Sequence, residues 1–381
     1  MKNVLILGST GSIGINALKV IEHLSDSFRV IGLTAYNNYR LLESQTRKFR
    51  PKYIATHEKN LGYLKKALSG IKVKTMDVER DLGLMASLPE VDIVVIAMPG
   101  SAALIPFLSA VRSGKIVAPA NKEAIVIAGG LIMSEAGRNG AKIIPVDSEQ
   151  SAIFQCLEGR NKTDLRKVHL TASGGALLNT SRKSFDKLTV KDILAHPRWK
   201  MGKKITVDSA SLMNKGFEVI EAKWLFDLSV EDINVVIHPE AIVHSMIELT
   251  DGSIIAQMAV TDMRLPIQYA LTYPKRLPTG LRPLDLAQWG KLSFLRPDFN
   301  KFPALSLAID VAKKGGALPC VLNAANEVAV EAFLNGEIKF TKIVEVVEKI
   351  VLRHKPCKSV KLNDINLADQ WAREETKKLI G

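Results

Sequence analysis

Short apolar runs alternate with longer segments of helical spacing through residues 1–147, and this alternation constrains the fold more than any other feature of the chain. The apolar runs are residues 4–7, 30–33, 53–55, 91–97, 115–118 and 142–145. Helical spacing between them is clearest in residues 13–24, 39–49 and 102–113. Strands of this kind suit a parallel sheet whose faces are covered by the connecting helices, so the pattern predicts a doubly wound α/β sheet.

The composition of the chain changes after Asp147. The next stretch is dense in Ser, His, Asn and Lys, and a proline-rich segment follows it. A helical pattern resumes in residues 304–313, 320–335, 340–353 and 363–379. We therefore expect an α/β domain (1–147), an α+β domain (148–272), a linker (273–298) and a small α-helical domain (299–381).

A glycine-rich loop follows the first predicted strand directly and leads into a helix. Its sequence is Gly8-Ser9-Thr10-Gly11-Ser12-Ile13-Gly14. Glycines permit a tight turn and a close backbone approach, so amide groups at the helix N-terminus can bind a pyrophosphate. The alternative is a tight turn without a ligand. The position of the loop inside a strand–helix–strand context favours the nucleotide site.

The end of the second predicted strand carries no carboxylate. Sites that prefer NAD usually place Asp or Glu there, bonded to the ribose 2′-hydroxyl. Here Ser9, Thr10 and Asn38 offer neutral hydrogen bonds and Arg40 lies nearby. A 2′-phosphate is compatible with these groups, so the sequence favours NADPH over NADH.

Three acidic residues form a candidate metal site. Asp147 and Glu149 follow an apolar strand. Because they are two positions apart, their side chains would point to the same side if the segment is extended. Glu218 is a third acid that can join them. Three hard oxygen ligands with open positions suit Mg²⁺ or Mn²⁺. The alternative is that Asp147 and Glu149 are exposed loop acids without a ligand.

Groups suited to a phosphate monoester occur in the same part of the chain. Ser173 precedes a pair of glycines, and Ser209 leads to Asn214 and Lys215. Hydroxyl, amide and ammonium groups together form a suitable phosphate-binding set. Taken singly, a Ser or Lys at such a position is more often a helix cap or a solvated surface residue.

A loop at residues 196–202 contains His196, Trp199, Met201 and Gly202. A large indole in a polar loop indicates a flap that closes over a ligand, and it is equally compatible with a packed anchor. His244 lies among apolar residues, which by itself is typical of a core histidine.

Composition narrows the class of protein. Three cysteines without close spacing argue against a disulfide framework and favour a reducing compartment. The net charge of +13 attracts anions, but the basic residues are scattered, which does not favour nucleic acid. Neither a secretory signal nor a run of about 20 apolar residues is evident, so we expect no membrane partner and a cytoplasmic location.

These motifs together resemble one family, 1-deoxy-D-xylulose 5-phosphate reductoisomerase of the bacterial type. The resemblance rests on the glycine loop and on residues 120–123, 145–155, 171–176, 196–201, 205–226, 238–239, 244–246 and 323–327, in the family's order over nearly the whole chain. It implies an N-terminal Rossmann-like NADPH domain, a catalytic domain that also carries the interface of a homodimer, and a C-terminal helical bundle.

The resemblance also implies roles for individual residues. The metal ligands would be Asp147, Glu149 and Glu218, binding Mn²⁺ or Mg²⁺, with Co²⁺ as a further candidate. The substrate-binding residues would be Ser148, Ser173, His196, Trp199, Ser209, Asn214 and Lys215. The cofactor-binding residues would be Gly8, Ser9, Thr10, Gly11, Ser12, Ile13, Gly14, Asn38, Asn121, Lys122, Glu123, Gly202 and Met263. Lys122, His196 and His244 would join the metal ligands as catalytic groups.

The chain departs from the family pattern at Tyr36-Asn37-Asn38, where a glycine, a basic residue and Asn are common. The implied activity is rearrangement of a phosphorylated ketose and its reduction by NADPH to 2-C-methyl-D-erythritol 4-phosphate, in isoprenoid precursor biosynthesis. Lys122 would donate a proton or stabilise an oxyanion.

Two alternatives remain at this point. One is an NADP-dependent dehydrogenase of another small phosphorylated or semialdehyde substrate. Semialdehyde chemistry needs a nucleophilic cysteine, whereas Cys156 lies inside an apolar helical run. The other is a nucleotide-sensing regulatory protein, which predicts NADPH binding without a metal requirement.

Overall fold

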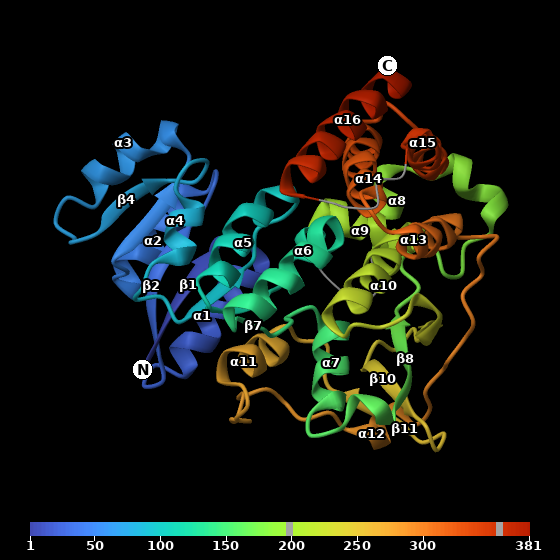
Figure 1. Cartoon of the computed structure of the whole chain (residues 1–381), viewed down its shortest axis with the longest axis horizontal. Helices are drawn as coiled ribbons and strands as arrows, with labels where there is room; N and C mark the ends of the chain where they lie inside the picture. Colours follow the sequence, from blue (N-terminus) through green and yellow to red (C-terminus); the bar gives the residue numbers. More distant parts are fainter. Residues whose placement is uncertain (196–200, 356–360) are drawn as a thin grey trace. The chain divides into compact units, whose positions relative to one another are not determined.

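The computed structural model describes residues 1–195, 201–355 and 361–381. The chain forms two compact units, each assembled from three segments. Unit 1 comprises Met1–Ala124, Ile132–Ser151 and Asp262–Leu281, and unit 2 comprises Ile125–Leu131, Ala152–Thr261 and Arg282–Gly381. Figure 1 shows the helices and strands of both units in sequence colours.

Unit 1 is built on a seven-stranded parallel sheet with the order β4-β3-β2-β1-β5-β6-β7. Its strands are β1 (Lys2–Leu7), β2 (Phe28–Thr34), β3 (Tyr53–Thr56), β4 (Lys74–Asp77), β5 (Ile93–Ile96), β6 (Ile116–Pro119) and β7 (Lys142–Ile143). The chain runs outward from β1 to β4 and then returns to the other side of β1 at β5. In sheets of this type, ligands bind at the carboxyl ends of the strands where the order reverses, here β1 and β5.

Helices connect the strands of unit 1. They are α1 (Ser12–His23), α2 (Tyr39–Phe49), α3 (Glu58–Ala67), α4 (Leu82–Ser87), the 3₁₀ helix η1 (Ser101–Ala103), α5 (Leu104–Arg112) and the ends of α6 (Glu123–Asn139). A later segment joins them, because α11 (Arg264–Thr272) packs against α1 and β6. The predicted doubly wound α/β sheet is confirmed.

Sequence reasoning missed one strand of this sheet, β4. Lys74 is exposed and Thr75 half-buried, so only the last two residues of the strand are buried. An apolar run of the kind that revealed the other strands is therefore missing here. The reason is that β4 is an edge strand, which has fewer neighbours to pack against.

Unit 2 contains a four-stranded sheet in the order β11-β10-β8-β9. The strands are β8 (Leu165–Ala172), β9 (Ile233–Ile237), β10 (Val243–Leu249) and β11 (Ile254–Met258). The β8–β9 pair is parallel, whereas β10 is antiparallel to both β8 and β11. α10 (Met213–Leu225) packs against β8 and β9.

Unit 2 also contains further helices. They are the larger part of α7 (Ser148–Leu157), η2 (Lys162–Asp164), η3 (Arg182–Lys187), α8 (Val190–Ile193), α9 (Lys203–Ser211), η4 (Val230–Asp232), α12 (Leu286–Trp289), α13 (Pro303–Lys314), α14 (Leu318–Leu334), α15 (Phe340–Arg353) and α16 (Leu362–Ile380). α14 is almost entirely buried and packs against α13, α15 and α16 (Figure 1). The predicted C-terminal helical bundle is confirmed, and each of its four predicted helices is present.

The structure differs from the sequence-based expectation around Asp147 and in the predicted linker. The segment around Asp147 is not extended as predicted: α7 begins at Ser148, and the Ser151 N–H donates to the Asp147 carbonyl at 2.8 Å. Asp147 therefore lies just before the helix and Glu149 in its first turn. The predicted linker, 273–298, includes the short helix α12. The four-part division stays a prediction.

Among the helices that the structure describes, none combines the length and the apolar character that crossing a membrane would require.

Candidate active site

The glycine loop between β1 and α1 has a backbone that only glycine accommodates at two positions. Gly8 adopts φ +87°, and a Cβ there would lie 2.6 Å from the Ala97 carbonyl oxygen. A Cβ on Gly14 would lie 2.4 Å from the Gly8 carbonyl oxygen. Gly11 precedes α1 in an extended conformation, and both Gly11 and Ser12 are exposed. The first turn of α1 thus faces solvent, where its amides can bind a phosphate group.

Ser9 lies in the glycine loop with its side chain buried. Its side chain is 0% exposed, and its hydroxyl donates to the Gln45 Oε1 atom at 2.7 Å. The Gln45 side-chain amide donates back to the Ser9 carbonyl at 2.9 Å. The Ser9 hydroxyl therefore holds the loop against α2, and the cofactor-binding role of Ser9 stays a prediction. Thr10 and Ile13 are half-buried beside it.

The carboxyl end of β2 carries Tyr36 and Asn38, both exposed. The Asn38 Oδ1 atom accepts a hydrogen bond from the Leu41 N–H at 3.2 Å and so caps α2. The Tyr36 hydroxyl donates to Glu79 at 2.9 Å, and this bond raises the pKa of Tyr36. The guanidinium carbon of Arg40 lies 6.0 Å from the centroid of the Tyr39 ring. This end of β2 is therefore polar and exposed, without a carboxylate of its own.

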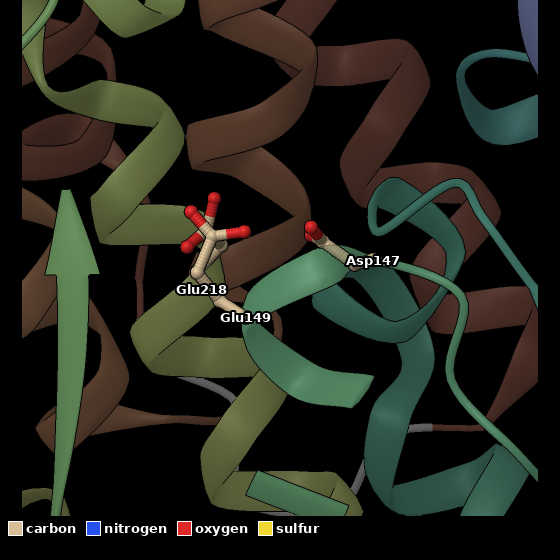
Figure 2. A group of neighbouring side chains, drawn as sticks. All are labelled: Asp147, Glu149 and Glu218. Atoms are coloured by element: carbon tan, nitrogen blue, oxygen red, sulfur yellow. The ribbon is translucent and has the colours of Figure 1, made fainter. Parts of the chain in front are cut away.

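The three acidic residues predicted to bind a metal converge. One carboxylate oxygen from each of Asp147, Glu149 and Glu218 lies within 4.8 Å of the other two. Figure 2 shows Glu149 and Glu218 side by side, with Asp147 close to them. Asp147 and Glu149 are half-buried and Glu218 is buried. Three carboxylate oxygens at this spacing are a donor set that fits Mg²⁺ or Mn²⁺.

Two lysines lie against this cluster. The Lys122 ammonium is 2.6 Å from Asp147, and the two side chains are 6% and 11% exposed. Lys215 forms an ion pair with Glu218, three residues further along α10. Formally, three carboxylates and these two ammonium groups leave one net negative charge. The remaining negative charge attracts a cation. The two ammonium groups lower the repulsion among the three carboxylates when no cation is bound.

The predicted phosphate-binding residues come from the loop after β8, which carries Ser173, and from the helices α9 and α10. Gly175 adopts φ +66°, and a Cβ there would lie 2.4 Å from the Ser209 carbonyl oxygen, so only glycine allows this approach. The Gly175 N–H donates to the Ser173 Oγ atom at 3.3 Å. Ser173 and Ser209 are therefore held in one region. Leu212, at φ 61°, joins α9 to α10. Asn214 and Lys215 follow in the first turn of α10.

Several other predicted residues occupy defined positions. The Ser148 hydroxyl donates to Glu149. The Asn121 Oδ1 atom accepts from the Glu123 N–H at 3.2 Å, at the start of the helix that follows Lys122. His244 lies on β10 and is 8% exposed. The roles of these residues stay predictions.

Two further residues, Met263 and Gly202, were predicted to bind the cofactor. Met263 precedes α11 and lies in unit 1, the unit that contains the glycine loop. Gly202 is exposed and precedes α9. The predicted flap residues His196 and Trp199 lie outside the described residues. Met201, at the edge of that segment, is half-buried.

Sequence reasoning missed a buried pair behind the phosphate-binding region. The Asn326 side-chain amide on α14 donates to Asp208 on α9 at 2.8 Å. Asp208 also pairs with Lys204, one helical turn earlier, at 2.8 Å. The i,i+4 spacing of Lys204 and Asp208 was visible in the sequence, but the partner on α14 was not.

Cys156 bears on the dehydrogenase alternative. Its side chain is 4% exposed, within α7. A nucleophilic cysteine must be reached by its substrate, and a reactive one is partly exposed. This burial supports the interpretation of Cys156 as a structural residue.

The doubly wound sheet, the glycine loop and the three converging carboxylates define a class of protein: a nucleotide-using, metal-dependent oxidoreductase. Three family models match the chain. They are described as 1-deoxy-D-xylulose 5-phosphate reductoisomerase over residues 4–129, the C-terminal domain of that enzyme over residues 143–226, and the DXP reductoisomerase C-terminal domain over residues 258–375. The chain belongs to the 1-deoxy-D-xylulose 5-phosphate reductoisomerase family.

Named relatives and solved structures agree with this family. The relative from Pelotomaculum thermopropionicum is 50% identical, with 100% of this chain and 99% of the relative covered. The one from Geobacter metallireducens is 48% identical, and both chains are covered fully.

Among solved structures, a DOX-P reductoisomerase in complex with NADPH, fosmidomycin and magnesium is 39% identical, with a TM-score of 0.95. The match covers 100% of this chain and 98% of that one. The Zymomonas mobilis enzyme in complex with NADPH is 39% identical, with a TM-score of 0.93 and coverage of 100% and 99%. The family predicted from the sequence motifs is confirmed.

Proposed function

We propose that this chain catalyses the NADPH-dependent and divalent-metal-dependent conversion of 1-deoxy-D-xylulose 5-phosphate to 2-C-methyl-D-erythritol 4-phosphate, a step that provides isoprenoid precursors. The observation that carries the proposal is the convergence of Asp147, Glu149 and Glu218 in a chain about half identical to named reductoisomerases over its full length. The predicted enzyme class, an NADPH-dependent oxidoreductase, is that of the family. The predicted cofactors, NADPH and a divalent metal, are those held by the solved relatives.

The three carboxylates would hold the cation. When bound, a divalent cation supplies Lewis acidity that polarises the carbonyl and hydroxyl oxygens of the ketose. Lys122 is positioned 2.6 Å from Asp147 and can hold a proton close to those oxygens. Glu218 is oriented by Asn214, whose side-chain amide donates to it at 2.6 Å.

The phosphate end of the substrate would bind Ser173, Ser209, Asn214 and Lys215. Lys215 forms an ion pair with Glu218, so the phosphate-binding and metal-binding groups are adjacent on α10. Binding energy from the phosphate is available to organise the reacting end of the substrate, since remote contacts can be used for orientation. NADPH, bound at the glycine loop, would supply the hydride. Asn38 and Arg40 are the candidate groups for its 2′-phosphate.

We also propose a cytoplasmic homodimer that acts on this small phosphorylated substrate. Phe294, Leu295 and Phe299 are each about half exposed and border one groove beside β9. Exposed apolar groups that gather in one place are typical of protein interfaces, and a second copy of the chain is the partner that the family implies. The low cysteine content supports a reducing compartment. Light scattering after gel filtration tests the dimer, and a monomer mass would refute it.

The function is tested by following NADPH absorbance with 1-deoxy-D-xylulose 5-phosphate as substrate. We expect oxidation that needs both the substrate and Mg²⁺ or Mn²⁺, that stops with a chelator and that resumes when excess metal is added. Glu149→Gln should abolish the metal-dependent rate, whereas Glu158→Gln, a substitution at an exposed acid just after the same helix, should not. A folded, metal-loaded protein that oxidises no NADPH with this substrate would refute the assignment.

A further inference from the structure

α9 contains a buried carboxylate that the proposed chemistry does not use. Asp208 is 1% exposed. Its Oδ1 atom accepts a hydrogen bond from the Asn326 side-chain amide at 2.8 Å, and its Oδ2 atom lies 2.8 Å from the Lys204 ammonium. A buried carboxylate is strongly unfavourable unless it is paired and hydrogen-bonded. These two partners fix the direction in which Asp208 points.

Asn326 is an unusual residue for its position. It lies in the middle of α14, is 0% exposed and has mainly apolar neighbours in that helix. Within the part of the chain that the structure describes, its Oδ1 atom accepts no hydrogen bond. A buried amide with an unsatisfied oxygen is destabilising, and an apolar side chain would avoid that penalty. The useful contribution of Asn326 is therefore the bond from its Nδ2 atom to Asp208.

The hydrogen bond between Asn326 and Asp208 lies next to the predicted phosphate site, because Asp208 directly precedes Ser209. Asp208 is followed by Ser209, whose carbonyl oxygen is the group that Gly175 approaches so closely. Lys204, the other partner of Asp208, also lies 4.8 Å from the centroid of the Phe217 ring on α10. Asp208 thus links α9 to α14 through its hydrogen bond with Asn326. Its partner Lys204 contacts α10 at the Phe217 ring. A shift of α9 would move Ser209 relative to both Ser173 and Asn214.

We infer that Asp208 and Asn326 form a positioning pair, which holds α9 so that Ser209 meets the substrate phosphate. The inference rests on the proposed function for the identity of the substrate. Neither residue is among those proposed to bind the substrate, the cofactor or the metal. Their effect is on the placement of the phosphate-binding groups, where misplacement by 1 Å can reduce the rate about 100-fold.

The chain offers a closely matched control for the test. Asn323 lies one turn earlier on α14, is also 0% exposed and also has an Oδ1 atom without a hydrogen-bond partner among the described residues. Its side-chain amide donates to Glu327 of the same helix at 3.0 Å instead of to α9. Asn323→Leu and Asn326→Leu therefore remove equivalent buried amides, and only the second removes the link to Asp208.

The experiment compares the two variants with the wild-type chain, loaded with metal and NADPH. For Asn326→Leu we expect the KM for 1-deoxy-D-xylulose 5-phosphate to rise about tenfold, with the KM for NADPH unchanged, because the lost hydrogen bond involves a charged group. The inhibition constant for inorganic phosphate should rise by a similar factor. Asn323→Leu should change thermal stability while leaving both constants at their wild-type values.

The outcomes separate the inference from the proposed function. If both variants raise the KM equally, or if Asn326→Leu leaves it unchanged, the positioning role is wrong. If the wild-type chain does not turn over the substrate, the proposed function is wrong. Calorimetric titration with inorganic phosphate then still tests the pair, since only Asn326→Leu should weaken phosphate binding, and equal binding by the two variants would refute the inference.

Discussion

The side chains of Asn214 and Glu218, one helical turn apart on α10, are joined by a hydrogen bond of 2.6 Å from Nδ2 to Oε1. Glu218 is buried and its other carboxylate oxygen pairs with Lys215. Both oxygens of a predicted metal ligand are thus contacted by residues predicted to bind phosphate. Groups that orient a metal ligand in this way tune the affinity of the site. A change at Asn214 should therefore affect metal binding as well as substrate binding.

The first prediction concerns Asn214→Leu. Removing the donor leaves Glu218 less firmly oriented, and loss of such outer partners typically weakens metal binding about 10- to 100-fold. We expect the dissociation constant for Mn²⁺, measured by calorimetry in the absence of substrate, to increase within that range. The KM for the sugar phosphate should increase as well.

Ser209→Ala provides the comparison for Asn214→Leu. Ser209 is also predicted to bind the phosphate, but it lies on α9 rather than on the helix that carries Glu218. Its loss should raise the KM for the substrate and leave Mn²⁺ affinity unchanged. Equal Mn²⁺ affinity in the two variants would show that the Asn214–Glu218 bond does not support the metal site.

The second prediction compares two glycines of the nucleotide loop. Gly14 is needed for the shape of the loop, and Gly11 would allow the pyrophosphate to approach the backbone. A methyl group at Gly14 would lie 2.4 Å from the Gly8 carbonyl oxygen, so Gly14→Ala must distort the loop. At Gly11 the closest atom is 3.5 Å away, an ordinary contact. We expect Gly14→Ala to lower the melting temperature and NADPH affinity together.

Gly11→Ala should give a different result, because Gly11 is exposed and its methyl group would meet no atom closer than 3.5 Å. The melting temperature should stay at the wild-type value, whereas NADPH affinity, measured by fluorescence titration, should fall as the pyrophosphate is kept from the backbone. Unchanged NADPH affinity in Gly11→Ala would place the pyrophosphate elsewhere.

The parallel sheet could be predicted from the sequence because its central strands are buried on both faces and are therefore apolar along their length. Residues 4–7 and 93–96 are at most 1% exposed, and both appear as uninterrupted apolar runs. β4 has no such run, since its first two residues are not buried. The prediction of an extended segment at Asp147 was wrong. A single residue before a helix has no periodicity that distinguishes it from an extended segment.

The candidate site was identified by motif, but its supporting contacts were not. Ser9 and Thr10 are adjacent hydroxyls, and nothing in the sequence says that the hydroxyl of Ser9 turns inward to Gln45. Asp208 and Asn326 are 118 positions apart, so no local pattern joins them. Such contacts depend on how distant helices pack, which the order of residues within any one helix does not specify.

The last prediction concerns the stability of α6. The Trp224 side chain lies so close to Gly129 that a Cβ there would be 2.2 Å from the indole Cδ1 atom and 2.9 Å from the tryptophan Cβ. The second distance involves the base of the side chain, so a rotation of the ring does not relieve the clash. On the same helix, Gly137 is exposed and has no atom within 4 Å of its Cβ position.

Alanine at these two glycines should therefore change stability in opposite directions. Gly129→Ala should lower the free energy of unfolding by about 1–3 kcal/mol through overpacking. Gly137→Ala should raise it by about 0.4–1 kcal/mol, because alanine loses less backbone entropy in a helix and meets no obstacle. The urea midpoints of the two variants, compared with wild type, measure both effects. If Gly129→Ala is as stable as Gly137→Ala, the contact between Trp224 and α6 is loose enough to accept a methyl group.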